Sequence, residues 1–332
     1  MITDEMTDSK GKAAVGRFYD TFFVNEYGKL ESLRAGRYHT PFSVVLMNVD
    51  HGSKTLADED VQEFLKRLSP TVLDAMRSCD VVGMIDDRQV AAILPETDYF
   101  GSLISMRKLS RAINNYLINE PPPVKKLIFS QATFPKDGRG YGALLSTASK
   151  RMSEKKESLW EKKEFSNKLF WEIIGELTGS TFKGFDNSSF DAGGGYSLQE
   201  SFIDQINELI IREITAAPHK RGIAYFASRG QAAAFPMMST IGHIGTLSTK
   251  VFVVGRGDDT FRDIKNATPI FIDDPRLKEV FFSFYLTEDS GYCLVCKENW
   301  GSTYSCFHSS DHYLVDGLIN KFQVEYSLQE QL

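Results

Sequence analysis

Two short groups of charged residues in the first hundred positions could do chemistry. The first is Arg77-Ser78-Cys79-Asp80, in which an arginine and an aspartate are three positions apart. A guanidinium group carries its donors in a planar fork, which suits phosphate groups and paired acceptors. The simpler interpretation is a surface ion pair, because an Arg-x-x-Asp motif is common by chance and such pairs contribute little to stability.

The second group, Asp86-Asp87-Arg88-Gln89, lies between two apolar runs. Val81 and Val82 begin the first run, and residues 90–94 form the second, which ends at Pro95. Short apolar runs bounded by turn residues are typical of buried strands. Aspartate suits a tight turn because its side chain bonds to nearby backbone. The pattern predicts a β-hairpin with this polar turn at its tip.

A basic cluster follows the hairpin on a predicted helix that stops before the prolines at 121–123. The helix is indicated by apolar residues at helical spacing: Leu103, Ile104, Leu109, Ile113 and Leu117. It carries Arg107, Lys108 and Arg111, of which Arg107 and Arg111 are four apart and share a face. A positive cluster opposite Arg77 is what a doubly negative ligand would need.

The surrounding elements are predicted as a helix within 13–38, a strand at 41–50, a helical stretch from about 58 to 76, the hairpin, the helix at 103–117, a strand at 125–135 and a helix at 141–152. Pro70 should kink or divide the second helical stretch.

This order, together with the segment from Arg77 to Val90, resembles the GGDEF family, the diguanylate cyclases, which join two GTP molecules into cyclic di-GMP. The resemblance covers about residues 13–158 and implies a nucleotide-cyclase-like fold related to the split βαβ architecture. In the family an Arg-x-x-Asp pair lies just upstream of a turn that reads Gly-Gly-Asp/Glu-Glu-Phe. The pair is present at the family spacing, but the five turn positions are Asp86, Asp87, Arg88, Gln89 and Val90.

The catalytic positions implied by the resemblance are altered. A cyclase needs carboxylates that hold divalent metal near the GTP phosphates. The first metal acid falls on Asn48, which has no charge, and Leu56 and Gln62 occupy guanine-recognising positions. Arg88 and Gln89 replace the acidic pair of the turn.

Asp86 and Asp87 stand where the family has two glycines, whose bare backbone lets substrate approach. We therefore expect no diguanylate cyclase activity, no catalytic residue, no metal and no cofactor.

The resemblance implies a different role for Arg77 and Asp80, the inhibitory site or I-site. There the arginine grips guanine edges and phosphate of an intercalated cyclic di-GMP dimer, and the aspartate accepts from guanine N–H groups. The family adds a basic residue from the following helix, and that position falls on Lys108, flanked by Arg107 and Arg111. We expect cyclic di-GMP to bind at these residues.

Length, composition and net charge limit which kind of protein this can be. A chain of 332 residues suggests two domains, and we place them at 1–158 and 159–332. A net charge of -6 argues against a general nucleic-acid binder. There is no apolar run of about 18 residues, and the first residues are polar, so we expect neither a membrane span nor a secretory signal. We expect a cytoplasmic protein of the α+β class.

The second half is expected to be an α/β domain. Residues 150–164 are dense in Lys, Arg and Glu and are predicted as a solvated helical linker. Helices are predicted at 202–215 and 312–322, and strands at 222–228, 250–255, 268–273, 280–286 and 292–298. The VFVVG strand, the DDPRLKEVFF stretch and the CLVCKEN strand resemble the DICT domain, a sensory-type module found beside GGDEF and two-component proteins.

The cysteines are weaker candidates for a functional site. Cys293 and Cys296, with Cys306 and two histidines downstream, have the composition of a zinc site. Their segment instead reads as a buried strand, where positions three apart point to opposite faces. Cys79 could be a redox-sensitive thiol, but core packing is the favoured interpretation.

Three functions remain open. The first is a non-catalytic signalling protein that binds cyclic di-GMP on a degenerate GGDEF domain and couples it to a sensory or relay domain, with signalling proteins or a second copy as partners. The second is a scaffold that only mediates protein association. The third is an enzyme with residual GTP-processing activity at the altered turn.

Overall fold

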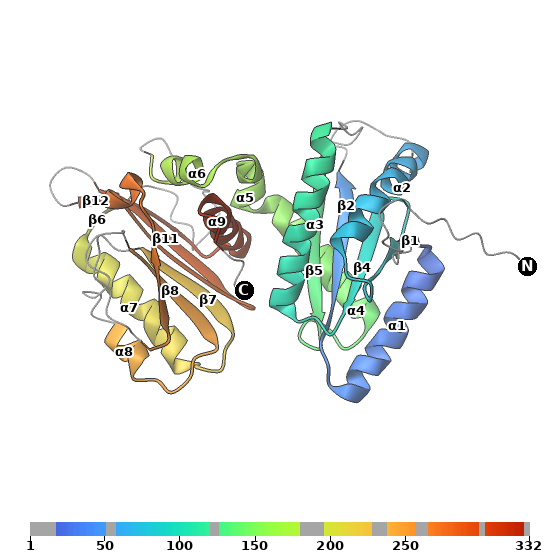
Figure 1. The fold of residues 1–332 in the computed structure, drawn as a ribbon, viewed down its shortest axis with the longest axis horizontal. Coiled ribbons are helices and arrows are strands. Elements are labelled where there is room, and N and C mark those ends of the chain that lie inside the picture. Colours follow the sequence, from blue (N-terminus) through green and yellow to red (C-terminus); the bar gives the residue numbers. More distant parts are fainter. Residues whose placement is uncertain are drawn as a thin grey trace, which may run out of the picture. The chain divides into compact units, whose positions relative to one another are not determined.

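The computed structural model describes residues 18–50, 58–119, 126–179, 196–227, 238–255, 265–298 and 303–328. The chain divides into two compact units, Met1–Glu154 (unit 1) and Lys155–Leu332 (unit 2) (Figure 1). Each unit combines helices with a sheet, which confirms the predicted α+β class. None of the helices in the described ranges is long and apolar enough to span a membrane.

The sheet of unit 1 has the strand order β1-β3-β4-β2-β5 within the described residues. Its strands are β1 (Phe18–Tyr19), β2 (Phe42–Asp50), β3 (Val81–Met84), β4 (Gln89–Pro95) and β5 (Lys126–Phe134). The pairing of β1 with β3 is parallel, and the other pairings are antiparallel. The predicted hairpin is thus present as β3 and β4, and β2 lies between β4 and β5.

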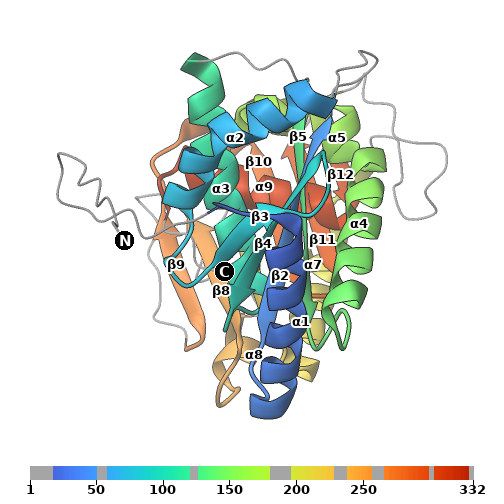
Figure 2. The same cartoon turned by 90° about the vertical axis from the view of Figure 1, so that its right-hand side faces the viewer.

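Four helices in the described part of unit 1 cover this sheet: α1 (Thr21–Tyr38), α2 (Asp58–Ala75), α3 (Tyr99–Asn119) and α4 (Tyr141–Glu157). Helices α1 and α4 lie on the same side of the sheet and share one apolar core with it (Figure 2). Helix α3 packs against β2 and β5, and α2 packs against α3.

Helix α1 begins later than the range 13–38 predicts. Asp20 caps it by accepting a hydrogen bond from the backbone N–H of Phe23, at 2.8 Å. Small residues dominate the buried side of the helix, which consists of Val24, Gly28, Glu31 and Ala35. Several large apolar side chains that indicated the helix are exposed instead. Residues 13–17 lie outside the described ranges.

Pro70 does not divide α2, so that part of the prediction is wrong. Leu68 and Val72 are both buried, so the apolar face continues past the proline. The absent N–H of Pro70 would have bonded the carbonyl of Lys66. The hydroxyl of Ser69 donates to that carbonyl at 2.8 Å and so offsets the loss.

The sheet of unit 2 has the order β6-β12-β11-β10-β7-β8-β9 within the described residues. Its strands are β6 (Tyr196–Gln199), β7 (Gly222–Ala227), β8 (Thr249–Gly255), β9 (Ala267–Phe271), β10 (Val280–Thr287), β11 (Gly291–Glu298) and β12 (Thr303–Ser309). Strands β7, β8 and β9 run parallel, and the other pairings are antiparallel. The sequence did not predict β6 or β12.

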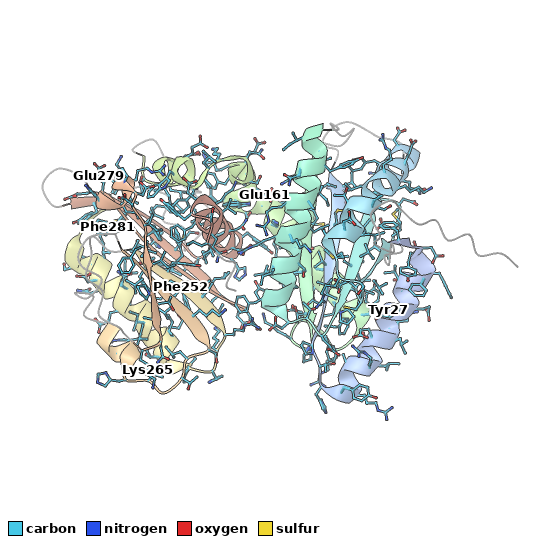
Figure 3. The ribbon with its side chains drawn as sticks, viewed as in Figure 1. Tyr27, Glu161, Phe252, Lys265, Glu279 and Phe281 are labelled. Carbon is cyan, nitrogen blue, oxygen red and sulfur yellow. The ribbon has the colours of Figure 1, made fainter. Side chains whose placement is uncertain are left out.

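The helices described in unit 2 are α5 (Leu159–Lys162), α6 (Phe170–Leu177), α7 (Glu200–Ala216), α8 (Met238–Gly242) and α9 (His312–Glu325). Helix α7 covers one face of the sheet with isoleucine side chains. An aromatic core lies where α6 and α9 pack on the sheet, and there Phe170 and Phe322 contact Phe282. The ring of Phe252 stacks on that of Tyr225, with centroids 4.9 Å apart. Figure 3 labels Phe252, which lies on β8.

The predicted solvated linker at 150–164 is wrong in its second part. Leu159 and Trp160 are buried in unit 2, although charged residues surround them in the sequence. The carboxylate of Asp311 accepts a hydrogen bond from the backbone N–H of Leu159 at 3.0 Å and thereby ties α5 to the start of α9. A Cβ on Gly317 would overlap the ring of Trp160, so α9 needs glycine there for this close packing.

We predict that Gly317→Ala lowers the free energy of unfolding of unit 2 by about 1–3 kcal/mol, because the methyl group overpacks the contact with Trp160. All three tryptophans of the chain lie beyond residue 154, so tryptophan fluorescence during urea unfolding reports on unit 2.

Gly175→Ala is the matched control. It lies in α6 with open space around its Cα, so alanine should leave stability unchanged or raise it by about 0.5–1 kcal/mol. Equal midpoints for Gly317→Ala and the unchanged chain would contradict the packing described here.

Candidate functional site

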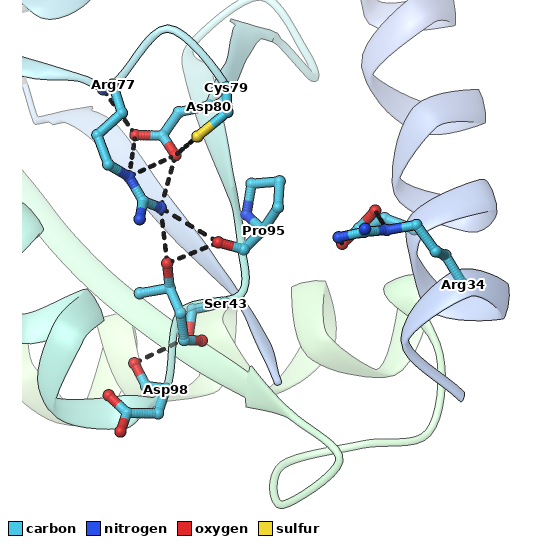
Figure 4. Close-up of polar contacts among 9 residues, drawn as sticks. Arg34, Ser43, Arg77, Cys79, Asp80, Pro95 and Asp98 are labelled. Carbon is cyan, nitrogen blue, oxygen red and sulfur yellow. Dashed lines mark hydrogen bonds and ion pairs between the residues drawn. The ribbon is translucent and has the colours of Figure 1, made fainter. Parts of the chain in front are cut away.

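The segment between α2 and β3 brings Arg77 and Asp80 together (Figure 4). The backbone N–H of Arg77 donates to Asp80 Oδ2 at 2.8 Å, and the N–H of Asp80 donates to the carbonyl of Arg77 at 3.0 Å. The guanidinium donates to the same carboxylate from Nη2 at 2.8 Å and from Nε at 3.1 Å. The three-residue spacing therefore closes a tight turn that fixes both side chains.

Arg77 also reaches the end of β4. Its Nη2 donates to Thr97 Oγ1 at 2.7 Å and to the carbonyl of Pro95 at 3.2 Å. The Thr97 hydroxyl donates in turn to that carbonyl at 2.9 Å. Hydrogen bonding to Asp80 raises the pKa of Arg77. One guanidinium thus joins the entry to β3 with the exit from β4, which an ordinary surface ion pair would not do.

The exposure of the two partners differs sharply. The side chain of Asp80 is 2% exposed, whereas that of Arg77 is 50% exposed. Both carboxylate oxygens of Asp80 accept from Arg77, so the aspartate orients the arginine. Among the described residues, Arg77 Nη1 makes no hydrogen bond, and the guanidinium therefore keeps donors for a ligand.

A second guanidinium, which the sequence did not assign to this site, comes from α1. Arg34 donates to Glu31 from Nε and from Nη2, both at 2.8 Å, and Glu31 is 3% exposed. This hydrogen bonding raises the pKa of Arg34. Arg34 Nη1 also lies 3.6 Å from Glu96 Oε1. Because Glu96 directly follows Pro95, Arg34 and Arg77 contact adjacent residues of one short segment.

Glu96 itself has a φ of 51°, in the left-handed region that a residue with a side chain rarely adopts. Its side chain is 68% exposed and carries a negative charge beside the two arginines. On either side of Glu96, Arg77 donates to the backbone carbonyl of Pro95 and to the side-chain hydroxyl of Thr97.

The basic residues of α3 are not alike. Arg107 is buried, with 5% of its surface exposed, so the structure does not present it to a ligand as the sequence suggested. The reason is helical phase, since Arg107 lies one turn after the buried Leu103. Lys108 and Arg111 are exposed. The hydrogen-bond partners of Arg77 come from Asp80 and the end of β4, so a joint role for α3 stays a prediction.

The polar turn Asp86-Asp87-Arg88-Gln89 lies at the opposite end of the hairpin. Asp86 Oδ1 accepts from the backbone N–H of Arg88 at 2.8 Å, as its residue type predicted. Asp87 Oδ1 accepts from Gln62 Nε2 of α2 at 2.7 Å. In the β2–β4 ladder Asn48 pairs with Gln89, and Val90 is buried next to it.

Asn48, Arg88 and Gln89, which the family resemblance places at catalytic positions, thus lie together at this tip. Leu56 lies outside the described residues. No group of three His, Cys, Asp or Glu side chains in the described part of the chain could hold a metal ion.

The cysteines fall into two classes. Cys79 is exposed, so the favoured prediction of core packing is wrong. The reason is its place in the tight Arg77–Asp80 turn, where only the aspartate points inward. Cys293 and Cys296 are buried in the unbroken strand β11, and Cys296 pairs with Cys306 across to β12. A hydrogen bond with Cys306, with burial, raises the pKa of the Cys296 thiol.

Comparison with known proteins gives matches among solved structures alone. No model of a protein family matches the chain. No curated protein matches it either.

A DGC protein from Thermotoga maritima is 12% identical and covers 41% of this chain and 97% of its own, with a TM-score of 0.34. The active GGEEF domain of a diguanylate cyclase from Vibrio cholerae is 11% identical, covers 42% and 92%, and has a TM-score of 0.37. The GGDEF domain of DgcB from Caulobacter crescentus, in complex with c-di-GMP, is 8% identical, covers 47% and 91%, and has a TM-score of 0.34. The second and third of these structures are described as a GGEEF and a GGDEF domain. At such identities and TM-scores the likeness carries no conclusion about activity.

We predict that Arg77→Ala loosens the base of the hairpin. The change leaves the nearly buried Asp80 carboxylate without its partner and removes the bonds to Pro95 and Thr97, at an expected cost of about 1–2 kcal/mol. Hydrogen exchange of backbone amides in residues 77–97 should then speed up by roughly 5–30-fold. Arg139→Ala, at an exposed position of the same unit, should leave this exchange unchanged.

Proposed function

We propose that unit 1 is a non-catalytic, GGDEF-like receptor domain that binds cyclic di-GMP through Arg77. The observation that supports this proposal is the half-exposed guanidinium of Arg77, which the nearly buried Asp80 holds in place. Its Nη1 atom makes no hydrogen bond to the described residues and is available to a ligand. A preoriented planar fork loses little freedom when it meets a phosphate or a guanine edge. The Arg-x-x-Asp pair matches the family's ligand-binding pair in residue type and spacing.

Charge at this site decides how well a dianionic ligand would bind. Asp80 balances Arg77, and Glu31 balances Arg34, so the exposed carboxylate of Glu96 is the remaining charge in this group. Binding would have to overcome repulsion from Glu96, with Lys108 and Arg111 of α3 as further predicted cations. Affinity should therefore depend on Glu96 as well as on Arg77.

Catalysis is disfavoured by the residues at the hairpin tip. Asn48, Arg88 and Gln89 offer no carboxylate where metal-assisted phosphoryl transfer requires one. Asp86 bonds to the turn backbone and Asp87 to Gln62. The base of the hairpin thus supports ligand binding, whereas the residues at its tip do not support catalysis.

The proposed output is signalling through unit 2, a DICT-like sensory or relay domain. Ligand binding changes the balance between two states of the protein only if its affinity for them differs. A scaffold without nucleotide binding is the rival proposal, and loss of affinity in an Arg77 variant separates the two.

We predict that calorimetric titration with cyclic di-GMP shows binding at micromolar or lower concentration, and that Arg77→Ala weakens it at least tenfold. Glu96→Gln should strengthen it, because it removes a negative charge next to Arg34 and keeps the shape of the side chain. Arg139→Ala is the matched control and should bind like the unchanged chain.

Absence of binding heat, with no shift of the melting temperature at saturating ligand, would rule out the receptor and leave the scaffold. Equal affinity in Arg77→Ala and Arg139→Ala would place the ligand elsewhere. Circular dichroism of each variant keeps unfolding apart from loss of the site.

We also predict that the protein forms no cyclic di-GMP or other product from GTP with Mg²⁺ or Mn²⁺, because the tip lacks the metal-binding charge. Chromatography of the nucleotides after overnight incubation measures this. A product that disappears in Arg88→Ala would support the residual enzyme instead.

A further inference from the structure

Helix α1 has an apolar outer face in addition to its buried inner one. On this face Phe22 is 76% exposed, Leu30 61% and Leu33 74%. Phe23, at the edge, is 40% exposed and stacks on Tyr19 with ring centroids 4.1 Å apart. Large apolar groups gathered on one helix face are a common mark of a protein interface.

The outer face also carries charged side chains, with opposite signs toward its two ends. Glu26 lies in the amino-terminal half of α1, and Arg37 lies in its last turn. Lys29 pairs with Glu26 at 2.6 Å, but both are more than half exposed, so solvent or a partner can replace that bond. Arg34 at the edge is engaged by Glu31 and Glu96.

We propose that this outer face, defined by Phe22, Glu26, Leu30, Leu33 and Arg37, pairs with the same face of a second copy of the chain in an antiparallel arrangement. A twofold axis between positions 31 and 32 places Leu30 opposite Leu33 of the partner. The same axis places Glu26 opposite Arg37 of the partner. Both pairs share one centre, so a single register satisfies the apolar and the charged contacts, as an isologous interface requires.

A parallel pairing in register would set Glu26 against Glu26 and Arg37 against Arg37, which is unfavourable. A helix of 18 residues is about 27 Å long, so one helix pair forms a small interface. The dimer is therefore weak and depends on protein concentration.

Sedimentation velocity of the full chain without nucleotide tests this interface. Over a rising concentration series the unchanged protein should shift from the 37.4 kDa monomer toward a dimer. Glu26→Arg alone, or Arg37→Glu alone, should lower the association constant at least tenfold, because each creates two like-charge contacts across the twofold axis. The double variant Glu26→Arg/Arg37→Glu restores opposite charges and should restore the dimer.

Leu33→Glu should abolish association, whereas Leu209→Glu, at another exposed leucine on α7, should not. Each side chain is exposed, so the variants should keep the melting temperature of the unchanged chain. A monomer at all concentrations, which would mean that the face is open or covered by another part of the same chain, overturns the proposal. So does a dimer that the single charge reversals leave intact. Because the samples contain no nucleotide, this result does not depend on cyclic di-GMP binding.

Discussion

The bonds made by Arg77 set the geometry of the hairpin on which unit 1 is built. One guanidinium holds the Asp80 carboxylate at the entry to β3 and the Pro95 carbonyl at the exit from β4. The hydroxyl of Thr97 completes the link. Because Asp80 is almost fully buried, its charge is compensated only while the arginine stays in place. The same constraint orients the exposed edge of the guanidinium, so the structural and the proposed binding roles use different nitrogens of one side chain.

The two ends of the hairpin differ in chemistry. At the base, charge is paired and held by several hydrogen bonds, and at the tip the turn is stabilised locally by Asp86 and by the contact between Gln62 and Asp87. A turn that satisfies its own backbone keeps the hairpin folded without glycine, and the carboxylates involved are already bonded. The residues at the tip can therefore vary without cost to the base. In the proposed function, this separation is the physical reason why the base could bind a ligand whatever residues stand at the tip.

The sequence alone predicted the elements with strong periodicity, such as β2, the hairpin and α7. It also predicted the pairing of Arg77 with Asp80. These features depend on residues that are neighbours in the chain. It could not predict features that depend on contacts between segments far apart in the chain. Arg34 joins the site only because α1 packs beside the end of β4, and Arg107 is buried because of its phase on α3. Trp160 was hidden in a charged stretch, and its burial depends on Gly317, more than 150 positions away. Local patterns hold no information on such contacts.

Helix α1 connects the two surfaces proposed for function. Its inner side carries Glu31, which holds Arg34, and its outer side carries Leu30 and Leu33. Arg34 follows Leu33 directly, so it lies at the edge of the outer face while its guanidinium reaches Glu96. An anion at Arg77 would compete with Glu96 for the two arginines and would change the charge at that edge. Association through α1 and ligand binding at Arg77 would then be linked, and the linkage would act equally in both directions, since any effect of ligand on dimer affinity implies the same effect of the dimer on ligand affinity.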